Sequence, residues 1–175
     1  RRVLLHDSST IGLPSRFAKD FPGSANQRKA FSQLKIQVVC NLLNDHVEHL
    51  SLSGFTRNDQ RASPDILALL RPGDLVIRDL GYFVLSVFAA IIERGAFFLS
   101  RYQYGKVLLD PRTQRPIPLS KVLKKQGFFD AHVLLGAEAK VPVRVVAVPV
   151  HDAVANLRRR KLRQNRDQSL NPSKE

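Results

Sequence analysis

Two short apolar runs, each followed by an aspartate, constrain this sequence more than any other feature. Residues 3–5 (VLL) precede Asp7, and residues 75–77 (LVI) precede Asp79. The second run is bounded by Pro72-Gly73 and Gly81, and such short, partly β-branched runs between turn residues are typical of buried strands. A carboxylate at the end of a buried strand is costly unless it is paired or binds a cation. The pattern therefore predicts two buried strands, each ending in a carboxylate that is paired or binds a cation.

The local pattern leaves two interpretations of these acids open. Asp79 could cap a following helix or pair with Arg78. Alternatively, the two carboxylates lie on neighbouring strands and share a divalent cation, because hard oxygen ligands suit Mg²⁺ or Mn²⁺. A cation held in this way supports metal-assisted phosphoryl transfer. Asp59 lies in a polar stretch and is interpreted as an Asx-turn residue rather than as a further ligand.

The periodicity of apolar residues predicts a mixed α/β fold. Strands are expected at residues 34–43, 47–53, 96–100, 129–135 and 141–150, and helices at 63–70, 83–94, 120–126 and 152–165. Residues 34–53 read as an antiparallel hairpin, so the first three strands are expected to be adjacent. Residues 54–61 are expected to form a loop.

The charge of the chain favours a polyanionic partner. Lys and Arg number 28 against 15 Asp and Glu, which gives a formal net charge of +13, and nucleic acid is the commonest partner of such a chain. The densest cluster lies in the last predicted helix and comprises Arg158, Arg159, Arg160, Lys161 and Arg163. This cluster is interpreted either as a phosphate-binding surface or as a solvated helix. No apolar run reaches the roughly 18 residues that a membrane span needs, so no membrane partner is expected.

Two motifs resemble a known family. The sequence DSST at residues 7–10, followed by IGLP at residues 11–14, resembles the first catalytic motif of DDE transposases of the IS-four insertion-sequence family. The sequence GDLVIRDLGYF at residues 73–83 resembles their second motif, and residues 97–102 and 141–148 fall where that family has similar strands. Leu80 departs from the pattern, since many members have Arg beside the second acid. Because of this departure, the resemblance does not extend to the contact that this Arg makes in the family. It still extends to the two acids of the metal site.

The resemblance implies a fold, a site and partners. It implies an RNase H-like core at residues 1–101, a β-rich insertion at residues 102–150, and a basic helix with a polar tail at residues 151–175. Asp7 and Asp79 would be catalytic ligands of Mg²⁺ (or Mn²⁺), and Arg101 would face the phosphate backbone. The implied partner is double-stranded DNA, both transposon ends and target. The implied assembly is a homodimer in the synaptic complex, in the cytoplasm and associated with the nucleoid.

The family's third carboxylate has no counterpart in this sequence. In the family it is a Glu within a Tyr-Arg-Glu-Lys signature, and the late acids Glu138, Asp152 and Glu175 lack that context. We therefore expect the third acid to lie beyond residue 175 and this chain alone to be inactive or nearly so. Two other functions remain open: a non-catalytic basic DNA-binding module derived from a transposase, and an RNase H-like nuclease that acts on another substrate, such as an RNA–DNA hybrid.

Overall fold

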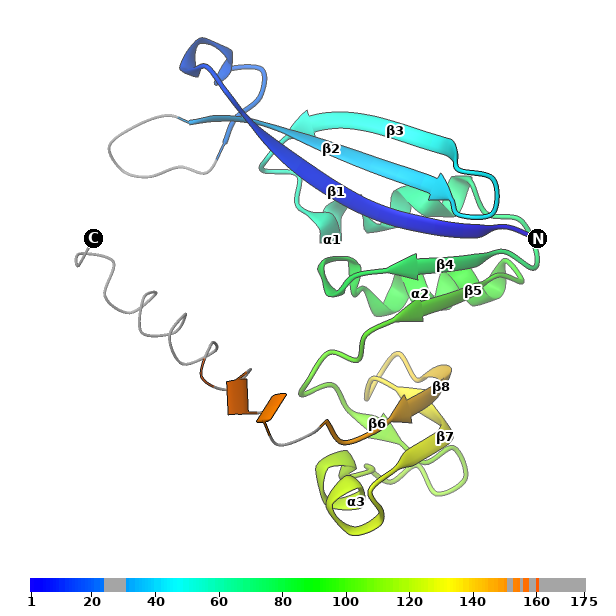
Figure 1. Cartoon of the computed structure of the whole chain (residues 1–175). Coiled ribbons are helices and arrows are strands. Elements are labelled where there is room, and N and C mark those ends of the chain that lie inside the picture. The colour runs from blue at the N-terminus through cyan, green and yellow to red at the C-terminus, as the bar shows by residue number, and fades with distance from the viewer. Residues whose placement is uncertain (24–30, 151–152, 155, 158–159, 161–175) are drawn as a thin grey trace.

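The structure is a computed structural model that describes residues 1–23, 31–150, 153–154, 156–157 and 160. A five-stranded mixed sheet forms its larger part. Its strands are β1 (Val3–Leu13), β2 (Ser32–Asn41), β3 (His46–Gly54), β4 (Leu75–Arg78) and β5 (Phe97–Ser100). Their order is β3-β2-β1-β4-β5 (Figure 1). The first three strands pair antiparallel, whereas β4 and β5 run parallel to β1. The predicted mixed α/β class and the adjacent opening strands are confirmed.

Helix α2 (Leu85–Glu93) packs against one face of this sheet. Its apolar residues recur at three- and four-residue steps, so Val87, Phe88 and Ile91 lie on one side and are buried. The Phe88 ring stacks on Phe98 of β5 with 4.1 Å between ring centroids. The helix ends before Gly95, which adopts a left-handed backbone with φ of 70°. The helix predicted at residues 83–94 is confirmed, with slightly tighter bounds.

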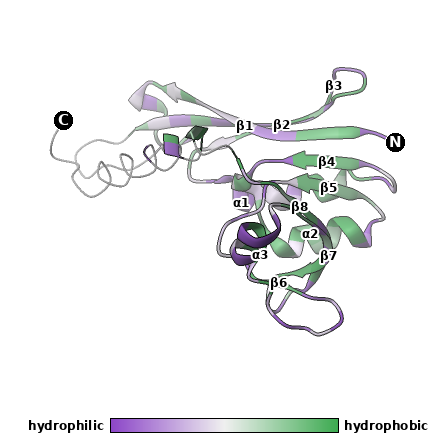
Figure 2. Cartoon of the chain, turned by 60° about the horizontal axis from the view of Figure 1, so that its bottom comes forward, coloured by the Kyte–Doolittle hydropathy of each residue, from purple (hydrophilic) through white to green (hydrophobic). Residues whose placement is uncertain are grey.

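A smaller antiparallel sheet lies beside β5 in Figure 1 and consists of β6 (Leu108–Leu109), β7 (Phe129–Leu135) and β8 (Val141–Ala147). Helix α3 (Leu119–Gln126) precedes β7 and is mostly hydrophilic, in contrast to the apolar β4, β5 and α2 (Figure 2). Strand β7 has its predicted bounds, whereas β8 ends three residues earlier than predicted. The division at residues 101 and 150 stays a prediction.

The segment between β3 and β4 differs from the prediction. Residues 54–61 were expected to be a loop, but α1 (Asp59–Ala62) begins there because the Asn58 side chain accepts a hydrogen bond from the Arg61 N–H at 3.0 Å. The 3₁₀ helix η2 (Ser63–Ala68) follows in place of the helix predicted at residues 63–70. Ser63 does not cap it, because its buried hydroxyl donates to the Tyr82 carbonyl at 3.1 Å. A contact 19 residues away in sequence therefore overrides the local capping preference.

An ion pair fixes how β1 and β4 align. Arg2 Nη2 lies 2.7 Å from Asp74 Oδ2, and the same carboxylate accepts from the Arg71 N–H at 2.8 Å. The Leu75 N–H donates to the Arg2 carbonyl at 2.9 Å, and Val3 then pairs with Leu75. The start of β4 is therefore held against the start of β1, which sets the register of everything that follows on both strands.

Candidate active site

The parallel pairing of β1 and β4 brings Asp7 and Asp79 to matched positions. His6 pairs with Arg78 in the last register step, and Asp7 and Asp79 are the next residues along the chain. Asp79 directly follows β4, whereas Asp7 lies within β1, which continues to Leu13. The prediction that the first strand ends at Asp7 is therefore wrong. The backbone of Asp79 is still extended, with φ of −81° and ψ of 170°. Residues at matched positions of neighbouring strands point to the same side of the sheet. Both acids are exposed, and they occupy the face opposite to His6 and Arg78.

The residues just before the two acids point into the helix-covered side. His6 and Arg78 are buried, with Arg78 Nη2 3.3 Å from His6 Nδ1 and 2.7 Å from the Ser63 carbonyl oxygen. Arg78 therefore cannot neutralise Asp79, which points to the other face. Asp79 does precede the 3₁₀ helix η3 (Leu80–Tyr82), but its side chain makes no capping hydrogen bond. Both local interpretations of Asp79, as a cap and as a partner of Arg78, are wrong.

Arg101 is the partner of Asp79. Ser100 pairs with Arg78 across β4 and β5, so Arg101 continues the row of matched positions that begins with Asp7 and Asp79. Arg101 Nε donates to Asp79 Oδ1 at 3.1 Å, and its Nη2 donates to the same oxygen. These hydrogen bonds hold the pKa of Asp79 below its ordinary value. The pair is open to solvent, since the side chains are 71% and 57% exposed, and is therefore available for exchange with other ligands.

Asp59 contacts the residue after Asp7 from the helix-covered side of the sheet, where the sequence predicted only an Asx turn. The capping role belongs to Asn58, and the Asp59 carboxylate instead accepts from Ser8 Oγ at 2.8 Å and pairs with Lys35 Nζ at 2.6 Å. Ser8 follows Asp7 directly. Sequence reasoning missed this arrangement because no local pattern links a helix-start acid to two different strands.

Burial of His6 gives the fold a dependence on pH. Burial, helped by the charge of Arg78, lowers the pKa of His6 from 6.5 to about 4. The folded state therefore holds His6 neutral while the unfolded chain takes up a proton, so the stability present above pH 6.5 is lost as the pH falls towards 4. Between pH 7 and pH 5 we expect the free energy of unfolding to fall by about 2 kcal/mol from this group.

The measurement is urea denaturation in EDTA at the two pH values, for the wild type and for His6→Asn. The variant is less stable at pH 7, but we expect the loss between pH 7 and pH 5 to be about 2 kcal/mol smaller than in the wild type. Equal losses in the two proteins would show that another group causes the pH dependence.

The carboxylate oxygens of Asp7 and Asp79 could supply part of the ligands of a divalent cation. Carboxylate oxygens are the ligands that Mg²⁺ and Mn²⁺ prefer, and Asp7 and Asp79 supply them from one face. Within the described residues no cluster of three or more His, Cys, Asp or Glu side chains could hold a metal ion. Of the basic residues singled out in the last predicted helix, Arg160 is exposed, while Arg158, Arg159, Lys161 and Arg163 lie outside the described residues.

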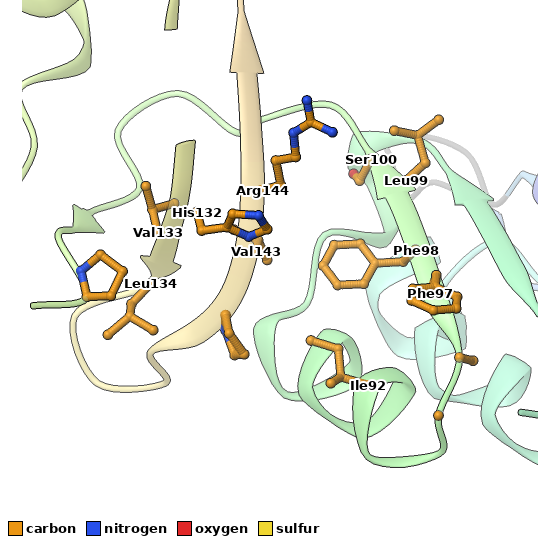
Figure 3. Close-up of a pocket in the computed structure, with 14 residues that line it drawn as sticks. Ile92, Phe97, Phe98, Leu99, Ser100, His132, Val133, Leu134, Val143 and Arg144 are labelled. Carbon is orange, nitrogen blue, oxygen red and sulfur yellow. The ribbon is translucent and has the colours of Figure 1, made fainter. Parts of the chain in front are cut away.

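A cleft of about 680 Å³ opens between β5 and the smaller sheet, away from the two acids. Figure 3 shows Phe98 and Ser100 of β5 on one side and His132 and Arg144 of β7 and β8 on the other. The lining contains no carboxylate and is mainly apolar. The size of this cleft therefore does not make it the candidate active site, because it lacks the groups that the chemistry needs.

Comparison with known proteins bears on the row formed by Asp7, Asp79 and Arg101. A family model described as the transposase DDE domain matches residues 1–167. The chain belongs to this DDE domain family. Its relatives include the transposase of insertion element IS231B from Bacillus thuringiensis subsp. berliner, which is 33% identical over 129 residues, or 74% of this chain and 27% of the relative. The transposase of IS1151 from Clostridium perfringens is 29% identical over 100 residues, or 57% of this chain and 21% of the relative.

The match confirms the family resemblance drawn from residues 7–14 and 73–83. DDE domains are RNase H-like, and the mixed five-stranded sheet of this DDE domain agrees with that class. The chain spans about a quarter of the length of the curated relatives it matches, 27% for IS231B. Among the described residues, no helix combines the length and the apolar character needed to cross a membrane.

Proposed function

We propose that this DDE domain contributes Asp7 and Asp79 as metal ligands to a DNA transposase of the cut-and-paste insertion-sequence type. One observation carries the proposal: the two acids follow matched positions of the parallel strands β1 and β4. Two carboxylates on one face repel each other in the absence of a counter-charge, and a shared cation removes that repulsion. Family membership supports the same assignment.

The chemistry proposed for the site is phosphodiester hydrolysis followed by strand transfer. When bound, Mg²⁺ or Mn²⁺ would supply the positive charge that activates an attacking oxygen and stabilises a leaving one. Asp7 and Asp79 would hold that charge in place from one face of the sheet. Arg101 would release Asp79 and donate to a phosphate oxygen of the substrate instead, since guanidinium groups bind phosphate in the same forked manner as carboxylate. Two carboxylates alone would bind metal weakly, so the described residues are expected to cleave slowly or not at all.

Double-stranded DNA is the proposed partner, as element ends and as target. The net charge of +13 supplies the attraction to phosphates. Arg101, in the row with Asp7 and Asp79, is the first proposed contact with phosphate, and the basic cluster at residues 158–163 is the second. A homodimer is proposed for the assembled transposase, because two element ends must be processed together.

Fluorescence anisotropy with a labelled DNA duplex tests this function. We expect Mn²⁺ to tighten DNA binding by about tenfold at fixed ionic strength, because each cation neutralises acids that otherwise repel phosphates. In Asp7→Asn and Asp79→Asn this increment should disappear. Without metal, both variants should bind DNA slightly more tightly than the wild type, because each has lost one negative charge.

Two other outcomes would assign a different function. Salt-sensitive DNA binding with the same Mn²⁺ response in all three proteins would identify a non-catalytic DNA-binding module. Preference for an RNA–DNA hybrid over duplex DNA in competition would identify an RNase H-like nuclease. Either result would contradict the proposed function.

A further inference from the structure

Asp59 contacts both of the segments that carry the acids. Its Oδ1 accepts a hydrogen bond from Ser8 Oγ at 2.8 Å, and Ser8 follows Asp7. On its other side Asp59 packs against Gly81, where an added Cβ would lie 2.7 Å from Asp59 Oδ2. Gly81 is two residues after Asp79. A single carboxylate on α1 therefore bridges the chain just beyond Asp7 and just beyond Asp79.

Strand β2 supplies two more donors to the same oxygen. Lys35 Nζ lies 2.6 Å from Asp59 Oδ1, and Gln37 Nε2 donates to it at 3.3 Å. The Lys35 side chain is only 8% exposed, so its ammonium group depends on Asp59 for a counter-charge. Burial alone would raise the pKa of Asp59, but the hydrogen bonds from Lys35 and Ser8 outweigh it and lower that pKa. The Asp59 carboxyl group is therefore ionised at neutral pH in the folded chain.

The network continues beneath the two acids. Gln37 uses its Oε1 to accept a hydrogen bond from the hydroxyl of Tyr82, which is buried. The Tyr82 ring lies 4.2 Å from the His6 ring and 5.0 Å from the Arg78 guanidinium carbon. His6 and Arg78 are the residues directly before Asp7 and Asp79. Asp59 is therefore linked both to the residues just after Asp7 and Asp79 and, through Gln37 and Tyr82, to the residues just before them.

We propose that Asp59 is a positioning residue that sets the spacing of Asp7 and Asp79 and thereby the affinity of the pair for a divalent cation. This inference rests on the proposed function. Asp59 is not assigned as a ligand, because its Oδ1 already accepts from three donors. Asp59 would affect the position of Asp7 through its hydrogen bond with Ser8, and the position of Asp79 through its contact with the backbone at Gly81. Outer partners of this kind commonly change metal affinity by 10–100-fold.

Mn²⁺ binding, followed by paramagnetic relaxation of water protons, measures this role directly. Asp59→Asn keeps the shape of the side chain but removes the charge that Lys35 pairs with. We expect it to bind Mn²⁺ about tenfold more weakly than the wild type. The matched control is Asp65→Asn, because Asp65 also pairs with one cation, Arg57 Nη2 at 2.7 Å, and has the same 28% side-chain exposure as Asp59. Asp65→Asn should bind Mn²⁺ like the wild type.

Further variants separate failure of this inference from failure of the proposed function. If Asp7→Asn and Asp79→Asn lose Mn²⁺ binding while Asp59→Asn keeps wild-type affinity, Asp59 is not a positioning residue and the proposed function stands. If Asp7→Asn and Asp79→Asn keep wild-type affinity, the proposed function itself fails. Should Asp59→Asn fold poorly, Ser8→Ala removes the hydroxyl contact with Asp59 and leaves the Asp59–Lys35 ion pair in place. A threefold weaker affinity at an unchanged melting temperature supports the inference, and wild-type affinity contradicts it.

Discussion

Asp79→Asn should weaken Mn²⁺ binding by at least about 100-fold while leaving the fold intact. Removing a carboxylate ligand costs at least as much as removing an outer partner, for which 10–100-fold is common. The effect on stability should be small, because the Asp79–Arg101 pair is exposed on both sides and such pairs contribute about 0–1 kcal/mol. Mn²⁺ titration and thermal unfolding of the same samples measure the two quantities.

The matched control for this variant is Asp130→Asn on β7. Asp130 also pairs with an arginine, because Arg144 Nε and Nη2 donate to its two oxygens at 2.7 and 2.6 Å. It lies on the smaller sheet, away from β1 and β4. If both variants lose Mn²⁺ binding to the same extent, the loss reflects surface charge rather than a site, and the assignment of Asp79 is wrong.

Asp74→Ala should destabilise the fold by about 3 kcal/mol, because it leaves Arg2 partly unpaired. The Asp74 side chain is only 2% exposed, and among the described residues the one other carboxylate paired with Arg2 is Glu48, with Oε2 at 2.9 Å. Burial alone would raise the pKa of Asp74, but hydrogen bonds from Arg2 and from the Arg71 N–H hold it below its ordinary 3.8. The contribution is therefore present at neutral pH and is lost as the pH falls below about 4.

Urea denaturation at pH 7 and at pH 3 checks this prediction. The difference between wild type and Asp74→Ala should be large at pH 7 and should shrink at pH 3. Asp65→Ala, which breaks the more exposed pair with Arg57, should cost no more than about 1 kcal/mol at pH 7. An Asp74→Ala variant as stable as Asp65→Ala would mean that the Arg2–Asp74 pair does not hold β1 and β4 in register.

The sequence predicted those features of the site that arise from local pattern. Apolar residues before Asp7 and Asp79 indicated strands, because β-branched and aliphatic residues suit a buried pleated surface. The regular spacing of Val87, Phe88 and Ile91 indicated α2 for the equivalent reason. The pairing of β1 with β4 was one of two interpretations that the local pattern left open, and the family resemblance favoured it, because no local signal states which strands become neighbours.

Contacts between distant residues account for what the sequence did not reveal. Arg101 was expected to face phosphate, but its guanidinium pairs with Asp79 across the ends of β4 and β5. Asp59 was expected to close a turn, but the buried ammonium of Lys35 determines its position. Both contacts depend on the strand order, which must be known before either can be foreseen.

Crystals of this chain soaked in Mn²⁺ would test the central claim most directly. The account predicts an anomalous scattering peak about 2.2 Å from carboxylate oxygens of both Asp7 and Asp79, the distance expected for hard cations with oxygen ligands. A peak that contacts only one of the two acids, or carboxylates that point to opposite faces of the sheet, would contradict it.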